Sequence, residues 1–206
     1  LTRALRDYAI KTLQKGRELL KDDKLFTTEL TNIYIQLQLT DKIIEEALGL
    51  VKDNDPTYLK ESETIIQNLL LDDEDDMKYL VLKNQLLRLS QKDANNTCYA
   101  SLLYWIYQIK KDYQGALVLA KSLDKRYKEE GERLYSLAQL VAKNREYDLA
   151  IDALQYILSK GEKSTYYSRA EQLLLEVKFQ KLSNTYPIKL AEAYDLENEF
   201  KRAISQ

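Results

Sequence analysis

The chain has 206 residues, of which 45% are hydrophobic and 31% charged, a balance typical of a folded protein rather than a disordered one. Its formal net charge is −2, from 31 basic and 33 acidic residues, so it lacks the basic surface that binding to a phosphate backbone requires, and nucleic acid is not expected as a partner. It contains no histidine and one cysteine, which excludes a Ser-His-Asp triad, a histidine base and a histidine-bearing zinc site.

Glycine and proline are scarce, with five and two residues, whereas an all-β fold needs many tight turns that draw on both. Long helices joined by short polar loops are therefore expected. No run of 18 apolar residues occurs, so we expect no membrane span in this chain. The chain opens on LTRALRDYAI, with neither Met nor a signal segment, and closes within an expected helix. We interpret it as a piece of a longer protein.

Helical periodicity of the apolar residues predicts helix along the whole chain and no strand. In residues 131–143, for example, Leu134, Leu137, Ala138 and Val141 fall on one helix face. The predicted helices, eleven in all, span residues 1–20, 24–38, 40–53, 57–71, 76–92, 97–110, 112–128, 131–144, 146–160, 165–182 and 187–204.

Turn residues mark several of the helix boundaries. Pro56 is expected to open the fourth helix, where its missing N–H costs nothing, and Pro187 to open the eleventh. Gly161 follows the ninth helix, where a left-handed cap is expected. The polar turn at residues 143–145 is too short for anything but an antiparallel hairpin.

An internal repeat links these hairpins. The segment from Lys110 to Leu123 aligns without gaps on the segment from Asn144 to Ile157, 34 residues later. Corresponding positions in the second helix of each hairpin are spaced by 34, 39, 34 and 34 residues, at Ala9, Ile43, Leu82, Ala116 and Ala150. We assign the five extra residues to the acidic stretch 72–76, which is expected to form an expanded loop.

This pattern resembles the tetratricopeptide repeat, a 34-residue helix–turn–helix unit, over about 150 of the 206 residues. With Gly131 as the first position, Leu134, Leu137, Ala138 and Val141 match the first helix of the repeat, and Ala150, Leu154 and Ile157 match the second. Tyr104 departs from it, because a small residue normally stands there. The resemblance implies an all-α fold, a right-handed α-solenoid of antiparallel helical hairpins.

The same resemblance predicts a single array over residues 1–206. Residues 1–20 are then the second helix of a cut repeat, and 24–56 a full repeat. Residues 57–96 form a degenerate repeat with the acidic loop, 97–130 and 131–164 two further repeats, and 165–206 a divergent C-terminal hairpin. The stretch from Leu102 to Leu140 is also similar to an internal part of large tetratricopeptide proteins of Bacteroidota-type bacteria. Those proteins generally carry an export signal, which implies the periplasm or cell envelope.

In tetratricopeptide arrays the first helix of each hairpin lines a concave groove, and the resemblance carries this role onto specific positions. In the 97–130 repeat they include Cys98 and Ile109, and in the 131–164 repeat Glu132 and Ala142. In one subclass of these arrays, Lys, Arg and Asn side chains at the groove positions clamp a C-terminal carboxylate. Here only Asn32 and Lys143 are of these types at the matching positions, so such a clamp is not expected. The candidate partner-binding residues are Asn32, Ser101, Trp105, Gln108, Tyr135, Gln139 and Lys143.

The most specific part of this hypothesis is an aromatic centre of the groove. Sixteen tyrosines and one tryptophan occur, more than a repeat core needs, and aromatic side chains make effective anchors at interfaces. We expect Trp105 and Tyr135 to lie on one wall of the groove. The alternative is that Trp105 packs between repeats.

Few other residues point to chemistry. Neither GxGxxG nor GxxxxGK[ST] occurs, and Cys98 is expected to be a small, partly buried residue. The stretch DDEDD at 72–76 could hold a hard cation, but it lacks the alternation and the glycine of an EF-hand loop, so a solvated loop is expected. No cofactor or metal is expected.

Three functions stay open at this point. The first is a non-catalytic scaffold that binds a protein or peptide partner in the groove. The second is a structural or self-assembly spacer, whose repeats either space other domains or stack against copies of the chain as a homo-oligomer. The third is a helical-barrel glycan-active enzyme, which would need a pair of buried carboxylates that nothing in the sequence marks.

Overall fold

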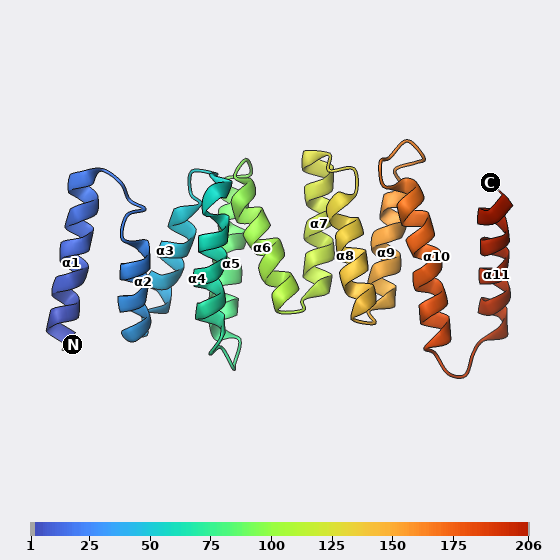
Figure 1. Ribbon diagram of the computed structural model, residues 1–206, viewed down its shortest axis with the longest axis horizontal. Coiled ribbons are helices and arrows are strands. Elements are labelled where there is room, and N and C mark those ends of the chain that lie inside the picture. The colour runs from blue at the N-terminus through green and yellow to red at the C-terminus, as the bar shows by residue number, and fades with distance from the viewer. Residues whose placement is uncertain (1–2, 206) are drawn as a thin grey trace. The chain divides into compact units, whose positions relative to one another are not determined.

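The architecture is all-α. A computed structural model describes residues 3–205 (Figure 1). Helix accounts for 76% of the structure, and no strand occurs within the described residues. Each helix packs mainly against its neighbours in the chain, as α2 does on α3, α3 on α4, α8 on α9 and α9 on α10. The prediction of an all-α, solenoid-like fold of helical hairpins is therefore confirmed.

The chain divides into two compact units, Leu1–Ile106 and Tyr107–Gln206, and the boundary falls within one helix. The first unit holds α1 to α5 and most of α6. Their bounds are α1 (Arg3–Leu20), α2 (Thr27–Gln36), α3 (Thr40–Leu50), a 3₁₀ turn η1 (Pro56–Tyr58), α4 (Leu59–Leu70), α5 (Met77–Lys92) and α6 (Thr97–Ile109).

The second unit continues the same pattern of neighbouring helices. Its core is made of side chains with almost no exposed surface, among them Leu134, Ala138 and Leu154. The bounds are α7 (Tyr113–Tyr127), α8 (Glu132–Lys143), α9 (Tyr147–Leu158), α10 (Tyr167–Ser183) and α11 (Leu190–Ser205). The single array over residues 1–206 stays a prediction.

Four of the five repeat positions lie in the core. Leu82, Ala116 and Ala150 have no exposed surface and Ile43 is 3% exposed, whereas Ala9 on α1 is half-buried. Small residues at 116 and 150 are expected where helices approach closely in a densely packed core. Tyr104, which stands where the repeat normally has a small residue, is nevertheless buried.

Four boundary predictions need comment. Pro56 opens the turn that leads into α4, as expected, and Gly161 has a left-handed φ of 91° after α9. Pro187 does not open the eleventh helix, because α11 begins at Leu190. A proline has a fixed φ and no N–H, so it fits a loop as well as a helix start. The second helix begins at Thr27 rather than at residue 24, because Phe26 has a left-handed φ of 60°.

The acidic stretch 72–76 is a loop between α4 and α5, but one of its members is not solvated. The Asp73 side chain is 7% exposed and accepts hydrogen bonds from the backbone N–H groups of Lys78 and Tyr79, at 2.9 and 2.8 Å. The first turn of a helix leaves such N–H groups without partners inside the helix. Asp73 therefore caps α5, and the expectation of a solvated loop is wrong for this residue.

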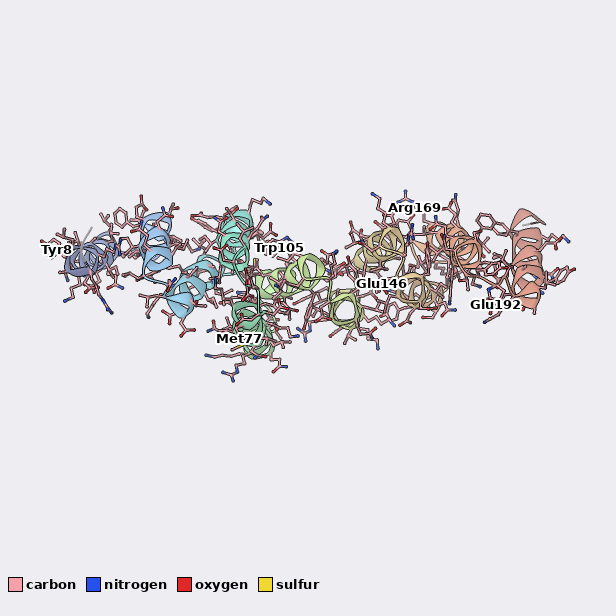
Figure 2. All side chains as sticks on the ribbon, turned by 90° about the horizontal axis from the view of Figure 1, so that it is seen from below. Tyr8, Met77, Trp105, Glu146, Arg169 and Glu192 are labelled. Atoms are coloured by element: carbon pink, nitrogen blue, oxygen red, sulfur yellow. The ribbon has the colours of Figure 1, made fainter. Side chains whose placement is uncertain are left out.

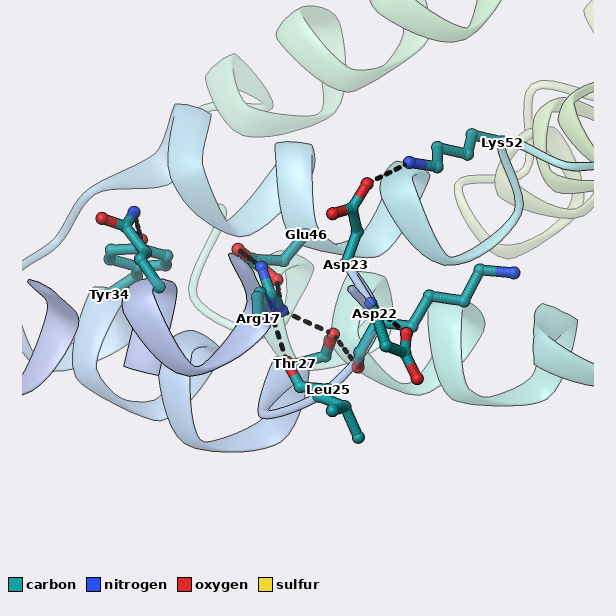
Figure 3. Close-up of polar contacts among 10 residues, drawn as sticks. Arg17, Asp22, Asp23, Leu25, Thr27, Tyr34, Glu46 and Lys52 are labelled. Carbon is teal, nitrogen blue, oxygen red and sulfur yellow. Dashed lines mark hydrogen bonds and ion pairs between the residues drawn. The ribbon is translucent and has the colours of Figure 1, made fainter. Parts of the chain in front are cut away.

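Two polar side chains tie the first unit together. Arg17 on α1 donates to both carboxylate oxygens of Glu46 on α3, at 3.0 and 2.6 Å, and also to the Leu25 carbonyl and the Thr27 hydroxyl (Figure 3). The buried Asn96 amide donates to the carbonyls of Val51 and Lys52 and accepts from backbone N–H groups at the start of α6. Satisfied buried polar groups of this kind hold helices in one arrangement.

Candidate functional site

The seven predicted partner-binding residues all retain exposed surface, but they are divided between the two units. Asn32, Ser101 and Trp105 belong to the first unit, and Trp105 is half-buried on α6 (Figure 2). Gln108, Tyr135, Gln139 and Lys143 belong to the second. Because Trp105 and Tyr135 lie in different units, their common wall stays a prediction. Cys98, which the repeat register also places on the groove, is 1% exposed, and burial raises the pKa of its thiol.

In the second unit, α8 separates its two faces cleanly. Leu134, Leu137, Ala138 and Val141 are buried. The opposite face carries Tyr135, Gln139, Ala142 and Lys143, at the spacing of three and four residues that puts side chains on one side of a helix. One stripe thus holds α8 in the fold, and the other keeps exposed surface.

The start of α8 is fixed by Gly131, Asp124 and Lys160. Gly131 has a φ of 93°, which strains any larger residue, and a Cβ there would lie 3.0 Å from the Ile157 side chain and crowd it. The Gly131 N–H donates to Asp124, at 2.8 Å, and the same buried carboxylate accepts from Lys160 at 2.6 Å. Asp124 lies on α7 and Lys160 just beyond α9, so the contacts set where α8 begins relative to both.

A hollow of about 440 Å³ lies between α8 and α10. Its volume falls in the range of sites that bind small molecules or the side chains of a partner. Because α9 packs against both α8 and α10, the two walls are held by one shared helix. The lining consists of Gln139, Leu140, Ala142 and Lys143 from α8, and Leu173, Val177 and Gln180 from α10.

An aromatic pair stands at the beginning of the same two helices. The rings of Tyr135 and Tyr166 have centroids 5.4 Å apart and are tilted by 42°. The Arg169 guanidinium lies 5.8 Å from the centre of the Tyr166 ring, close enough for an attraction between cation and ring. Lys143 is at the other end of α8, roughly 12 Å away from Tyr135 along the helix at 1.5 Å per residue.

The polar groups of the hollow are available to a ligand. The side chains of Gln139, Lys143 and Gln180 make no hydrogen bond or ion pair with any other residue that the structure describes. The remaining lining is apolar, and none of the seven lining residues carries a carboxylate, hydroxyl or thiol. Two amides and one ammonium can pair with the main chain and with an acidic group of a ligand, while the leucines and the valine cover apolar side chains.

We call the hollow, together with Tyr135, Tyr166 and Arg169, the α8/α10 groove. The sequence identified the α8 side of it, at Tyr135, Gln139 and Lys143. It missed the α10 side, because the last hairpin fits the repeat poorly and gave no register for Leu173 or Gln180. The helical period of α10 holds a usable signal, since Tyr166, Leu173 and Gln180 recur at intervals of seven residues, which keeps them on one side.

Two other hollows are lined mostly by charges that already have partners. One, of about 240 Å³, lies beside α11, where Lys178 pairs with Glu199 at 2.7 Å and Lys189 with Glu192 at 2.8 Å. The other, of about 460 Å³, surrounds the turn after α1, where Lys52 pairs with Asp23 at 2.6 Å. Such mutual pairing leaves less for a ligand than the open amides of the α8/α10 groove.

Within residues 3–205, no helix is both long and apolar enough to cross a membrane. No cluster of three or more metal-binding side chains occurs among the same residues. The acidic loop therefore contributes a helix cap at Asp73 and no metal-binding cluster. In comparisons with known proteins, no family model matches the chain, and no curated protein does either.

Proposed function

We propose that the chain is a non-catalytic interaction module that binds a peptide segment of a protein partner in the α8/α10 groove. The observation that carries the proposal is the combination of an apolar floor with three polar side chains that have no partner of their own. Gln139, Lys143 and Gln180 are exposed, so their amides and ammonium are free to pair with a ligand beside the apolar floor.

The groove chemistry favours an extended segment over a helix. The amides of Gln139 and Gln180 can each donate and accept, which matches the free N–H and C=O groups of an extended main chain. A helix satisfies those groups internally and would leave the amides without partners. The distance of roughly 12 Å from Tyr135 to Lys143 corresponds to about four extended residues. Leu140, Leu173 and Val177 would then cover one or two apolar side chains of the segment.

The tetratricopeptide register supports the same proposal. It places Tyr135, Gln139, Ala142 and Lys143 on the partner-binding face of a first helix, and α8 presents these four residues away from its buried stripe. We further propose that the chain belongs to a larger exported protein of the cell envelope, as the resemblance of the stretch from Leu102 to Leu140 implies.

The test is a selection of peptides on the whole chain, followed by matched variants. Random twelve-residue peptides displayed on phage would be selected against the protein, and the Kd of the recovered peptides measured by fluorescence polarisation. Gln139→Ala, Leu173→Ala and Lys143→Glu each remove one kind of groove contact. We expect each to weaken binding by about 1–2 kcal/mol, roughly five- to thirtyfold.

Matched controls carry the same changes outside the groove. Gln155→Ala alters an exposed glutamine on α9, and Lys125→Glu reverses an exposed lysine near the end of α7. Both should leave the Kd unchanged. If the recovered peptides bind the groove variants and the controls equally well, they bind elsewhere and the proposed function is wrong.

A further inference from the structure

The chemistry of the α8/α10 groove changes along its length. At its start lie the rings of Tyr135 and Tyr166, both half-buried. Leu140, five residues after Tyr135 on α8, lines the hollow together with Leu173 of α10. Lys143, three residues further along α8, lines the same hollow and is exposed. An aromatic, an apolar and a cationic position therefore follow one another along the groove.

The spacing of these positions suits an extended segment. Tyr135 and Lys143 are eight residues apart, or roughly 12 Å along the helix at 1.5 Å per residue. An extended segment advances about 3.3 Å per residue, so about four residues cover this distance. Side chains of such a segment alternate between its two sides, and residues two or four apart point the same way. The first, third and fifth residues of a segment can thus face the groove together.

The two ends of the groove favour different side chains. Lys143 is the one charged residue among the seven that line the hollow, and its ammonium has no partner among the residues that the structure describes. A hydrogen bond between an ammonium and a carboxylate is stronger than one between neutral groups, so an acidic side chain fits this end. At the other end the rings of Tyr135 and Tyr166, 5.4 Å apart and tilted by 42°, offer edges and faces to a third ring.

We propose that the groove selects a five-residue extended motif with an aromatic residue at one end, an apolar residue in the middle and an acidic residue at the other end. The aromatic ring packs on Tyr135 and Tyr166, the apolar side chain on Leu140 and Leu173, and the carboxylate pairs with Lys143. The groove amides both donate and accept, so the motif can be read in either direction of the main chain. The inference rests on the proposed function and adds to it the chemistry of the peptide.

The test compares synthetic peptides on the whole chain by fluorescence polarisation. The reference peptide has blocked ends and a fluorescein label, with phenylalanine, leucine and glutamate at its first, third and fifth positions and threonine between them. A second peptide carries the same residues in reverse order, and the tighter binder of the two becomes the reference.

Two altered peptides then test the acidic position. One has glutamine in place of glutamate, and the other exchanges the glutamate with the adjoining threonine, which keeps the composition but makes the spacing odd. We expect each alteration to raise the Kd about tenfold. The advantage of glutamate over glutamine should shrink as salt is added, because salt screens the pairing with Lys143.

Variants of the chain assign each peptide position to its groove residue. Lys143→Gln should make the glutamate and glutamine peptides bind equally, and Lys143→Glu should favour a peptide with lysine at that position. Tyr135→Ala should remove the preference for phenylalanine over alanine at the aromatic position. Lys125→Gln, at an exposed lysine on α7, is the matched control and should leave both preferences unchanged. Lys143 is exposed as well, so its substitution should leave the fold intact.

Three results would overturn the inference. The first is equal binding of the evenly and oddly spaced peptides, and the second is a preference for glutamate that persists in Lys143→Gln. The third is a set of selected peptides that bind the groove but lack the motif. The proposed function would survive all three as long as Leu173→Ala weakens the selected peptides. If Leu173→Ala weakens neither the selected nor the synthetic peptides, the proposed function fails together with the inference.

Discussion

At the scale of single residues, Thr27 and Thr31, which lie one turn apart on α2, show how a hydrogen bond changes the free-energy cost of burying a hydroxyl. The Thr27 hydroxyl is buried but donates to the Lys24 carbonyl at 2.9 Å and accepts from Arg17 at 3.0 Å (Figure 3). The Thr31 hydroxyl is equally buried and has no hydrogen-bond partner among the described residues. A buried hydroxyl without a partner costs free energy, whereas a satisfied one contributes.

We therefore predict opposite effects of one substitution at the two sites. Thr31→Val keeps the shape of the side chain and removes the unsatisfied hydroxyl, so the free energy of unfolding should rise by about 1 kcal/mol. Thr27→Val removes two hydrogen bonds and should lower it by about 1–2 kcal/mol. Urea denaturation of both variants measures the difference. Equal destabilisation by the two substitutions would mean that Thr31 does have a partner.

At the scale of helices, Asp124 and Tyr156 join α7 to α9. The Tyr156 hydroxyl donates to the Asp124 carboxylate at 3.1 Å. Burial, and the hydrogen bond and charge of Asp124, raise the pKa of Tyr156 from 10.0 to about 12. Ionisation of this phenol would place a second negative charge beside the carboxylate, so the fold favours the protonated form.

The raised pKa gives a prediction for alkaline pH. Below pH 10 Tyr156 is protonated in both the folded and the unfolded chain. Between pH 10 and 12 the unfolded chain releases the proton first, so stability falls as pH rises through this window. Tyr156→Phe cannot ionise and should lack this part of the decline. The free energy of unfolding of both proteins, measured from pH 9 to 12 in urea, would show the difference as a shallower slope for the variant.

At the scale of the whole molecule, the contacts are local, and this limits how far damage should travel. Ala150 has no exposed surface, so Ala150→Leu should overpack α9 and cost about 1–3 kcal/mol. Trp105, the only tryptophan, lies in the other unit and reports on it by fluorescence. We expect Ala150→Leu to lower the thermal midpoint seen by circular dichroism more than the midpoint seen by Trp105. An equal shift in both signals would show that the two units unfold as one.

The sequence predicted the helices well because the period of apolar residues such as Leu134 and Val141 is set by the backbone itself. It could not predict the burial of Asp73, which depends on where the N–H groups of α5 point after the loop has folded. The α8 half of the candidate groove could be predicted from the sequence, since α8 follows a repeat register. The other half was not, because Leu173 and Gln180 belong to a hairpin whose residues have diverged from that register.

The attachment of α1 has a consequence for local stability. Its polar links to the rest of the unit are Arg17 and a long hydrogen bond of 3.5 Å from the Gln14 amide to the Tyr34 hydroxyl, and no residue of α1 is buried. The free energy needed to open one part of a protein follows the apolar area that the part buries, so α1 should open at far lower cost than α3 or α9. The fraction of time for which such a helix is folded depends on the groups that pack against it. Leu5, Tyr8 and Leu19 of α1 are 54%, 72% and 72% exposed. Any group that packs against these three side chains would therefore do more than bind to α1, because it would also set how much of the time that segment is helical.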